Sequence, residues 1–420
     1  MSSAVSNPQA HAPTSSRRVL VVVTVAAVVL SLSMGLRQSL GLFLQPMNAG
    51  LGISASTFGF ALALQNLVWG ISQPAVGMLG DRFGARPVLI GCALIYAAGL
   101  LLMASSGPLI GLNIGGGLLA GLGVAGTGFG VLLGTVARAV PSEKRVQTLG
   151  AVSAAGSLAT LLIAPLGQFL IADFGWRIAL LVFAVIALSM ALCAVFIGRE
   201  HAAWVHGPAE GPKTTTRDAL LSAARHPGFL AMTAAFFACG FQLMYITAHL
   251  PSFLAICGVE PTVSATALGV IGLGNAVGSY IAGLLGARYS QKRLLALIYL
   301  LRTLAIICFL AMPITLASTL VFAAAMGLLW LSVLPLVSGL IGRLFGLQHF
   351  NTLFGITFLS HQIGAFMGAW LGGLTFDLTG SYSTAWGSMI AIGASAFLLQ
   401  WFMDDRPRSD RPLARAAVAL

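Results

Sequence analysis

Charged residues are so sparse in this chain that most of it can only fold inside a membrane. Lys, Arg, Asp and Glu make up 8% of the 420 residues, whereas 58% are hydrophobic. A soluble domain is about one quarter charged, and a helix needs about 20 apolar residues to cross a bilayer. Twelve such apolar runs begin near Val19, Thr57, Val88, Pro108, Val146, Arg177, Phe229, Val263, Leu294, Leu316, Thr352 and Ala385. We therefore expect an all-α polytopic membrane protein with twelve transmembrane helices.

The longest polar stretch divides the runs into two groups of six. We predict a tail over 1–18, a six-helix bundle over 19–198, a linker over 199–226, a second six-helix bundle over 227–403 and a tail over 404–420. The two halves also repeat in sequence, because Gly77 to Arg82 has a counterpart in Gly283 to Arg288. Repeats of this kind accompany a substrate site between two pseudo-symmetric halves.

The basic residues outside the apolar runs predict the orientation of the chain. With both termini on one side, that side collects nearly all of them, whereas the opposite side holds only Arg177. Lys and Arg are enriched in cytoplasmic loops. We therefore expect both termini and the linker in the cytoplasm, and the chain in the cytoplasmic (inner) membrane.

The composition argues against several other classes of protein. The net charge of +11 comes from basic residues scattered between apolar runs, which does not suit nucleic-acid binding. The cysteines lie in or at the ends of the apolar runs and lack the spacing of metal ligands. No nucleophile–base spacing or phosphate-binding loop stands out in the sequence. We expect a monomer in a lipid bilayer, with no enzyme activity, metal, cofactor or nucleic-acid partner.

Two basic residues, Arg37 and Arg302, fall inside apolar runs, whereas every acidic residue lies in a loop, in a tail or at the end of a run. An arginine at the centre of a span costs about 2.5–3.5 kcal/mol on insertion scales. Without a carboxylate in the spans, the natural partner is an anion that binds and leaves. This asymmetry favours an anionic substrate, and we expect a carboxylate. The alternatives are that Arg37 reaches the outer headgroups and that Arg302 binds backbone carbonyls or a neighbouring helix.

Two histidines, His249 and His361, also fall inside apolar runs. Histidine changes charge near neutral pH, so these residues are the candidates for proton coupling. The alternative is a neutral imidazole that is hydrogen-bonded between helices. Gln242, Tyr245 and His249 follow one another at helical spacing and share a face, which predicts polar neighbours or a water-filled cavity beside them.

Two tryptophans and two asparagines lie near the middle of predicted spans. Tryptophan is more usual at the membrane interface, so a flat apolar part of a substrate could stack there, with ordinary helix packing as the alternative. The complete set of predicted substrate-binding residues is Arg37, Asn66, Trp69, Gln242, Tyr245, His249, Asn275, Arg302, Trp330 and His361.

A short charged loop, Gly77-Met78-Leu79-Gly80-Asp81-Arg82-Phe83-Gly84-Ala85-Arg86, joins the second and third apolar runs. It resembles the signature G-x-x-x-D-R-x-G-R-[RK] of the major facilitator superfamily, with Ala85 in place of the first of the two closing basic residues. The resemblance implies a secondary transporter that works by alternating access. It also implies a conformational latch made of Gly77, Gly80, Asp81, Arg82, Gly84 and Arg86.

Other fragments resemble the monocarboxylate and oxalate/formate branch of that superfamily. They are Arg138, Arg145, Pro165 and the triplet Gly175-Trp176-Arg177. The motif G-P-x-x-G-G of drug/proton antiporters is not met, because Ala164 precedes the proline and Gln168 and Phe169 replace the closing glycines. The eighth run holds Asn275 and no arginine, although this branch usually places an arginine there.

These observations favour a secondary active transporter that moves a small organic anion across the membrane by alternating access. Its coupling would be proton symport, through histidine or the protonated substrate, or exchange of one anion for another. One alternative is uptake or efflux of a neutral or aromatic compound such as a vitamin or a drug. A further alternative is a membrane receptor that uses the fold without transport.

Overall fold

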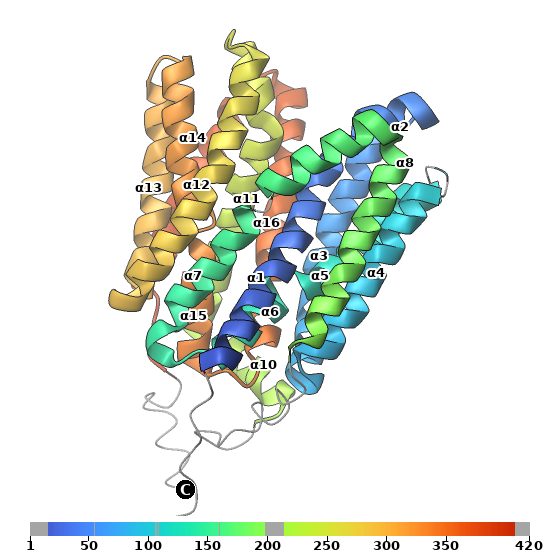
Figure 1. Ribbon diagram of the computed structural model, residues 1–420. Helices are drawn as coiled ribbons and strands as arrows, with labels where there is room; N and C mark the ends of the chain where they lie inside the picture. The colour runs from blue at the N-terminus through green and yellow to red at the C-terminus, as the bar shows by residue number, and fades with distance from the viewer. Residues whose placement is uncertain are drawn as a thin grey trace, which may run out of the picture.

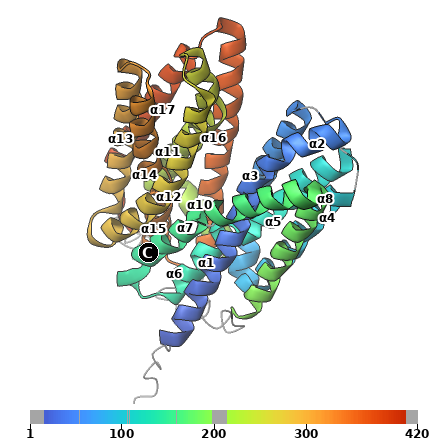
Figure 2. The same cartoon turned by 45° about the horizontal axis from the view of Figure 1, so that its top comes forward.

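The computed structural model describes residues 16–53, 55–105, 107, 109–158, 160–197 and 214–407, and this part of the chain is helical, without a strand. The helices α3, α4 and α8 lie on one side of the molecule and α12, α13 and α14 on the other in both views (Figure 1 and Figure 2). The first fifteen residues of the predicted N-terminal tail, residues 199–213 of the predicted linker and residues 408–420 of the C-terminal tail lie outside the described residues.

The N-terminal half forms six membrane-length segments, several of which are built from consecutive helices. They are α1 (Ser16–Ser39) with η1 (Leu40–Phe43) and α2 (Leu44–Leu51), α3 (Ala55–Phe83), α4 (Ala85–Ser105), η2 (Leu109–Leu119) with α5 (Ala120–Thr127) and α6 (Phe129–Ala139), α7 (Ser142–Leu158) with the part of α8 (Thr160–Val195) before Gly175, and the part of α8 after Gly175. Helix α8 bends at Gly175 (φ 82°, ψ 160°), where a positive φ suits glycine. The bend separates the end of the fifth segment from the sixth.

The C-terminal half repeats this arrangement after a short linker helix. Its helices are α10 (Thr216–Ala224), α11 (Pro227–Ile256), α12 (Pro261–Arg288), α13 (Gln291–Ala311), α14 (Leu316–Trp330), α15 (Val333–Phe345), α16 (Phe350–Thr379) and α17 (Ser383–Phe402). Helix α10 lies within the predicted linker and begins with a capping box, in which Thr215 and Asp218 satisfy each other's backbone N–H groups.

The described helices confirm the predicted twelve spans. Nine segments are long and apolar enough to cross a membrane, and one of them, Ser142–Val195, holds two spans separated by the bend at Gly175. Helices α3 and α16, with 29 and 30 residues, supply the remaining two spans. The protein is therefore all-α, with twelve transmembrane helices in two halves of six.

The fourth and the tenth spans are both broken near their middle. In the fourth span, Gly128 adopts an extended conformation (φ −88°, ψ −157°) between α5 and α6. In the tenth span, Pro335 has no N–H to give to the carbonyl of Leu331, and Leu334 N donates to that carbonyl instead at 3.1 Å. The backbone carbonyl of Trp330 consequently loses its usual helical donor, so it needs another partner.

Small residues bring the two halves into close contact along two helix pairs. Helix α3 packs against α16, where a Cβ atom on Gly77 would overlap the backbone of Asn351 and one on Gly355 would overlap Pro74. Helix α7 packs against α12 at Gly150, where a Cβ would lie 2.7 Å from the Cα of Gly283. Glycine at such positions lets helix backbones approach closely inside a membrane.

The α7–α12 contact can be tested with two glycine-to-alanine substitutions on α12 that should differ in their effect on the stability of the folded protein. A Cβ on Gly283 would lie 2.9 Å from the Cα of Gly150, whereas a Cβ on Gly272 meets nothing within 4 Å. We expect Gly283→Ala to destabilise the folded protein by about 1–3 kcal/mol through overpacking. Gly272→Ala should be neutral or stabilising by up to about 1 kcal/mol, because alanine is the better helix former. Thermal unfolding in detergent measures both, and equal effects of the two substitutions would contradict the close packing.

Candidate functional site

Arg37 lies well inside the first span and is held by neutral groups. The helical segment runs from Arg17 to Leu51, so the guanidinium is far from both ends of the span. Its Nη2 donates to Asn66 Oδ1 at 2.5 Å, and its Cζ lies 4.8 Å from the centroid of the Trp69 ring. Its buried Nε has no hydrogen-bond partner among the described residues. The cation is therefore oriented by an amide and an aromatic face, and no carboxylate is bound to it in the described part of the chain.

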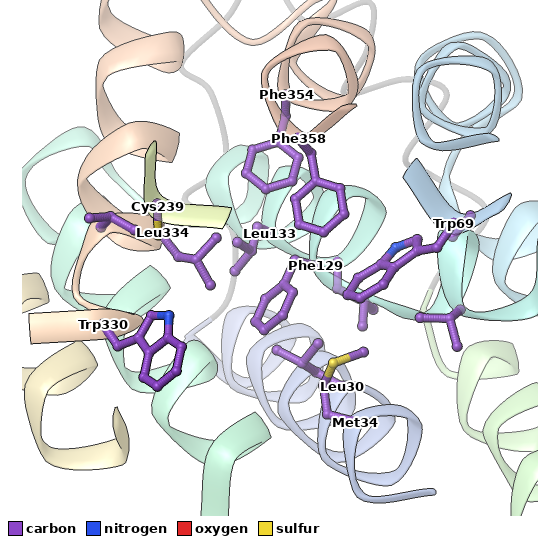
Figure 3. Packing of buried hydrophobic residues seen from close by; sticks show 14 of the residues in the cluster. Leu30, Met34, Trp69, Phe129, Leu133, Cys239, Trp330, Leu334, Phe354 and Phe358 are labelled. Atoms are coloured by element: carbon purple, nitrogen blue, oxygen red, sulfur yellow. The ribbon is translucent and has the colours of Figure 1, made fainter. Parts of the chain in front are cut away.

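An aromatic surface lies beside Arg37 and is held in place by hydrogen bonds. Trp69 Nε1 donates to Gln73 Oε1 at 2.9 Å, and Gln73 Nε2 donates to the carbonyl of Ala125 at 3.0 Å, next to the break in the fourth span. The Trp69 ring lies 4.7 Å from that of Phe358 on α16. Figure 3 shows Trp69, Phe129 and Phe358, which come from three different helices, turned toward one another.

Gln362 on α16 connects this site to the other half of the protein. Its Nε2 donates to the backbone carbonyl of Asn66 at 2.9 Å, while its Oε1 lies 3.1 Å from His361 Nδ1. Since an amide oxygen only accepts, His361 Nδ1 carries the proton in this contact. The chain Arg37–Asn66–Gln362–His361 therefore crosses from α1 to α16 without a charged partner for the arginine. Sequence reasoning missed Gln362, although its place next to His361 in an apolar helix was a usable signal.

Arg302, Asn275 and Trp330 meet at the break in the tenth span. Arg302 is fully buried, and its Nη2 donates to the carbonyl of Trp330 at 2.5 Å. Leu331 N, directly after that carbonyl, donates to Asn275 Oδ1 at 3.2 Å. The two side chains thus satisfy the backbone groups that the break exposes, which hydrocarbon could not do.

The polar stripe of α11 packs within the C-terminal half. Gln242 Nε2 donates to the carbonyl of Met389 on α17 at 3.2 Å, and the Tyr245 ring lies 5.3 Å from the Trp386 ring. His249 Nε2 lies 2.8 Å from the carbonyl of Ala369 on α16. The stripe makes these contacts with α16 and α17, so the structure does not group the three residues with Arg37.

The signature loop holds the two halves together through Asp81. Its carboxylate accepts hydrogen bonds from Asn351 N at 3.2 Å, Thr352 N at 2.8 Å and Thr352 Oγ1 at 2.7 Å, all at the start of α16. It also pairs with Arg138 Nη1 at 3.3 Å, and both side chains are nearly buried. A helix N-terminus favours a negative charge, so the carboxylate stabilises the contact by charge as well as by geometry.

The other predicted latch residues contribute differently. Gly77 and Gly80 lie against Asn351, and Gly84 ends α3 with a positive φ of 83°. Arg82 is exposed, with its Cζ 5.1 Å from the Phe83 ring centroid, and Arg86 is half-buried. Sequence reasoning did not identify Arg138, Asn351 and Thr352 as the partners of Asp81, because they are distant in sequence and meet it only through packing.

Comparison with known proteins agrees with this architecture. Residues 24–337 and 257–419 match the family described as the Major Facilitator Superfamily. The chain belongs to this superfamily. It is 30% identical over 375 residues to monocarboxylate transporter 11 of Mus musculus, covering 87% of this chain and 83% of that protein. It is 27% identical over 373 residues to monocarboxylate transporter 13 of Rattus norvegicus, covering 88% and 84%. These relatives confirm the predicted resemblance to the monocarboxylate branch.

Solved structures show the same fold at low sequence identity. The proton:xylose symporter XylE superposes with a TM-score of 0.73 at 15% identity, covering 93% of this chain and 96% of the symporter. The E. coli fucose:proton symporter FucP gives a TM-score of 0.67 at 16% identity, covering 92% and 99%. Membership of the Major Facilitator Superfamily makes the chain a multi-pass membrane transporter and not an enzyme, as the sequence predicts.

The contacts of Asp81 lead to a test of the latch. Removing one partner of a buried ion pair costs about 3–5 kcal/mol, and each ~1.4 kcal/mol shifts a two-state equilibrium tenfold. We expect Asp81→Asn to shift the protein toward conformations that are open at this end. Spin labels on cysteines at the exposed positions Phe83 and Tyr289, one in each half, would then report longer distances in double electron–electron resonance.

Glu143→Gln is the matched control, because Glu143 is an exposed acid whose side chain bonds only its neighbour Ser142 among the described hydrogen bonds. It should leave the distance distribution unchanged. An unchanged distribution in Asp81→Asn would show that the contact with α16 does not hold the halves together.

Proposed function

We propose that this transporter carries a small organic anion, a carboxylate, and that Arg37 binds it. The proposal rests on the groups that surround the Arg37 guanidinium within its span. Its partners are the neutral Asn66 amide and the Trp69 ring, and its Nε has no hydrogen-bond partner within the part of the chain that the structure describes. A carboxylate is the anion that best fits the two-pronged donor geometry of a guanidinium. The names of the monocarboxylate transporter relatives support the same substrate class.

The residues around Arg37 suit such a ligand. A carboxylate that takes Nε and one Nη of Arg37 would displace Asn66 Oδ1 from the guanidinium. The apolar part of the substrate would then rest on Trp69 and Phe358, whose rings lie side by side. The guanidinium of Arg37 lies over the face of the Trp69 ring, and an anion that binds its N–H groups leaves this cation–π contact in place.

Substrate binding at Arg37 would bear on the contact between the halves. Asn66 accepts from Gln362 across the halves and from Arg37 within its own half. Releasing its side chain therefore changes a residue that joins α3 to α16. Alternating access then follows from the competition between this contact and the latch at Asp81, since a ligand shifts the equilibrium by its differential affinity for the two states. We place the latch end and both termini in the cytoplasm, because the basic loop residues gather there.

The coupling is either to protons or to a second anion. His361 lies in the same hydrogen-bonded chain as Arg37 and is the histidine placed to sense the substrate. Proton symport would use this imidazole, or the substrate would carry the proton itself. Exchange of one anion for another needs neither.

A second candidate is transport of a neutral or aromatic compound. It is favoured by the aromatic surface of Trp69, Phe129 and Phe358, which Figure 3 shows among the buried apolar side chains between the halves. In that case Arg37 serves to hold Trp69 and Asn66, and no anion is required.

Flux in liposomes distinguishes the two candidates. We expect saturable uptake of labelled carboxylates by the purified protein, tested over a panel of mono- and dicarboxylates with and without a proton gradient. Arg37→Gln should lower carboxylate flux by about 10- to 100-fold, because a hydrogen bond to a charged group contributes about 1.5–3 kcal/mol. Arg37→Lys should retain part of the flux, since it keeps the charge without the fork of donors.

Arg177→Gln is the control for a general effect of losing a positive charge, because Arg177 is exposed and stacks on Trp176. It should transport normally. Carboxylate flux that survives in Arg37→Gln would contradict the role of Arg37. Flux of neutral aromatic compounds, with none of carboxylates from a folded protein, would favour the second candidate.

A further inference from the structure

The turn between α12 and α13 is the second copy of the signature loop, and it lacks the acid of the first copy. In the sequence repeat, Ala287 stands where the first loop has Asp81. Ala287 is exposed, and its methyl group cannot make the charged contact by which Asp81 binds the start of α16. The second loop nevertheless keeps three basic residues, which are Arg288, Lys292 and Arg293. The latch does not account for these cations.

No acidic group in the described part of the chain neutralises the three cations. None of them forms an ion pair or a side-chain hydrogen bond with another described residue. The sequences of α12 and α13 contain no Asp or Glu. Glu260 precedes the 28-residue α12 and is therefore about 40 Å away, and Glu143 on the neighbouring α7 is bonded to Ser142. The turn thus forms a positively charged surface.

Two of the cations lie at the ends of apolar stripes that α12 and α13 expose. On α12, Ile281 and Leu285 are 43% and 39% exposed, and Arg288 follows three residues later on the same face. On α13, Leu297 is 47% exposed, and Arg293 precedes it by four residues. Both helices lie at the outside of the molecule in Figure 1. Inside a bilayer, these stripes face lipid chains, so the cations stand at the level of the headgroups.

The N-terminus of α13 adds to the positive potential at the same place. Lys292 and Arg293 lie in its first turn, and the side chain of Ser290 does not cap it. The first N–H groups of a helix carry a partial positive charge, which favours an anion nearby. Tyr289, between the two helices, is 63% exposed, and tyrosine is typical of the membrane–water interface.

We propose that the α12–α13 turn binds the headgroup of an anionic phospholipid through Arg288, Lys292 and Arg293, while the acyl chains lie along the exposed stripes of the two helices. Charge complementarity selects this occupant, because basic residues at this depth attract anionic lipids. Free phosphate would meet only the charges, whereas a lipid also covers the apolar stripes. The inference goes beyond the proposed function and does not depend on which substrate is carried or on Arg37.

The lipid site lies close to a contact between the two halves. A Cβ on Gly283 would lie 2.9 Å from the Cα of Gly150, and one on Gly286 would lie 2.7 Å from Cγ1 of Val146 on α7. A headgroup bound at the end of α12 therefore anchors the part of that helix that meets the N-terminal half. We expect the bound lipid to raise the temperature of thermal unfolding.

Native mass spectrometry of the purified full chain in detergent tests the site. Phosphatidylglycerol and phosphatidylcholine with identical acyl chains are titrated separately, and the apparent Kd of the first bound lipid is measured for each. We expect phosphatidylglycerol to bind at least about tenfold more tightly and to be weakened by added salt. Arg288→Gln with Arg293→Gln should weaken it by about 25-fold, because each basic residue near the surface contributes about fivefold.

Two variants control for general effects of the substitutions. Arg217→Gln with Arg225→Gln removes two exposed arginines of the linker and should leave phosphatidylglycerol binding unchanged. Arg288→Lys with Arg293→Lys keeps the charges and should retain most of the binding. Phosphatidylglycerol, and not phosphatidylcholine, should also raise the unfolding temperature of the wild type.

Three results would overturn the proposal. The first is equal affinity of the wild type for the two lipids. The second is an equal loss in the two glutamine variants, which would trace binding to net charge and not to this turn. The third is displacement of phosphatidylglycerol by an equal concentration of inorganic phosphate, which would show that the apolar stripes contribute nothing. Failure of carboxylate flux would contradict the proposed substrate and leave the lipid site untouched.

Discussion

The structure depends on a constraint that the bilayer imposes: a polar group exposed inside it must find its partner within the protein. Two spans break near their middle, at Gly128 and at Leu331, and each break frees backbone groups. Gln73 binds the carbonyl of Ala125 beside the first break, and Arg302 and Asn275 bind the carbonyl of Trp330 and the N–H of Leu331 at the second. Gln73 in one half, and Arg302 and Asn275 in the other, therefore stabilise breaks at equivalent places.

The proposed alternating access requires that the two halves separate and close again. Their contact is made by glycines, which allow close approach without interlocking side chains, as at Gly150 and Gly283. At one end the contact is strengthened by a charge, because Asp81 accepts three hydrogen bonds from the start of α16 and pairs with Arg138. Along α3, the described hydrogen bonds between halves run from Asp81 to Asn66, so the proposed substrate site and the Asp81 contact lie along the same helix.

The asymmetry of buried charge links this architecture to function. The two arginines within spans have no carboxylate partner in the described residues, yet their burial and their hydrogen-bond partners differ. Arg37 is half-buried and held by weakly competing neutral groups, which suits a cation that exchanges its partner for a substrate. Arg302 is fully enclosed, and its Nη2 binds the backbone carbonyl of Trp330 at the break of the tenth span.

The sequence alone determined the twelve spans, the two halves, the superfamily and the short candidate list containing Arg37, Arg302 and His361, because apolar length, sparse charge and a local loop motif are encoded along the chain. The grouping of those candidates was decided by the tertiary structure. Gln362 stands in the sequence only as an amide next to His361 until packing places its side chain against the backbone carbonyl of Asn66. Likewise, the α11 stripe shares a helix face, as its spacing predicts, but which helices that face meets depends on how α11 is rotated against α16 and α17. Periodicity specifies the face of a helix, whereas its partner is set by the packing of residues that are distant in sequence.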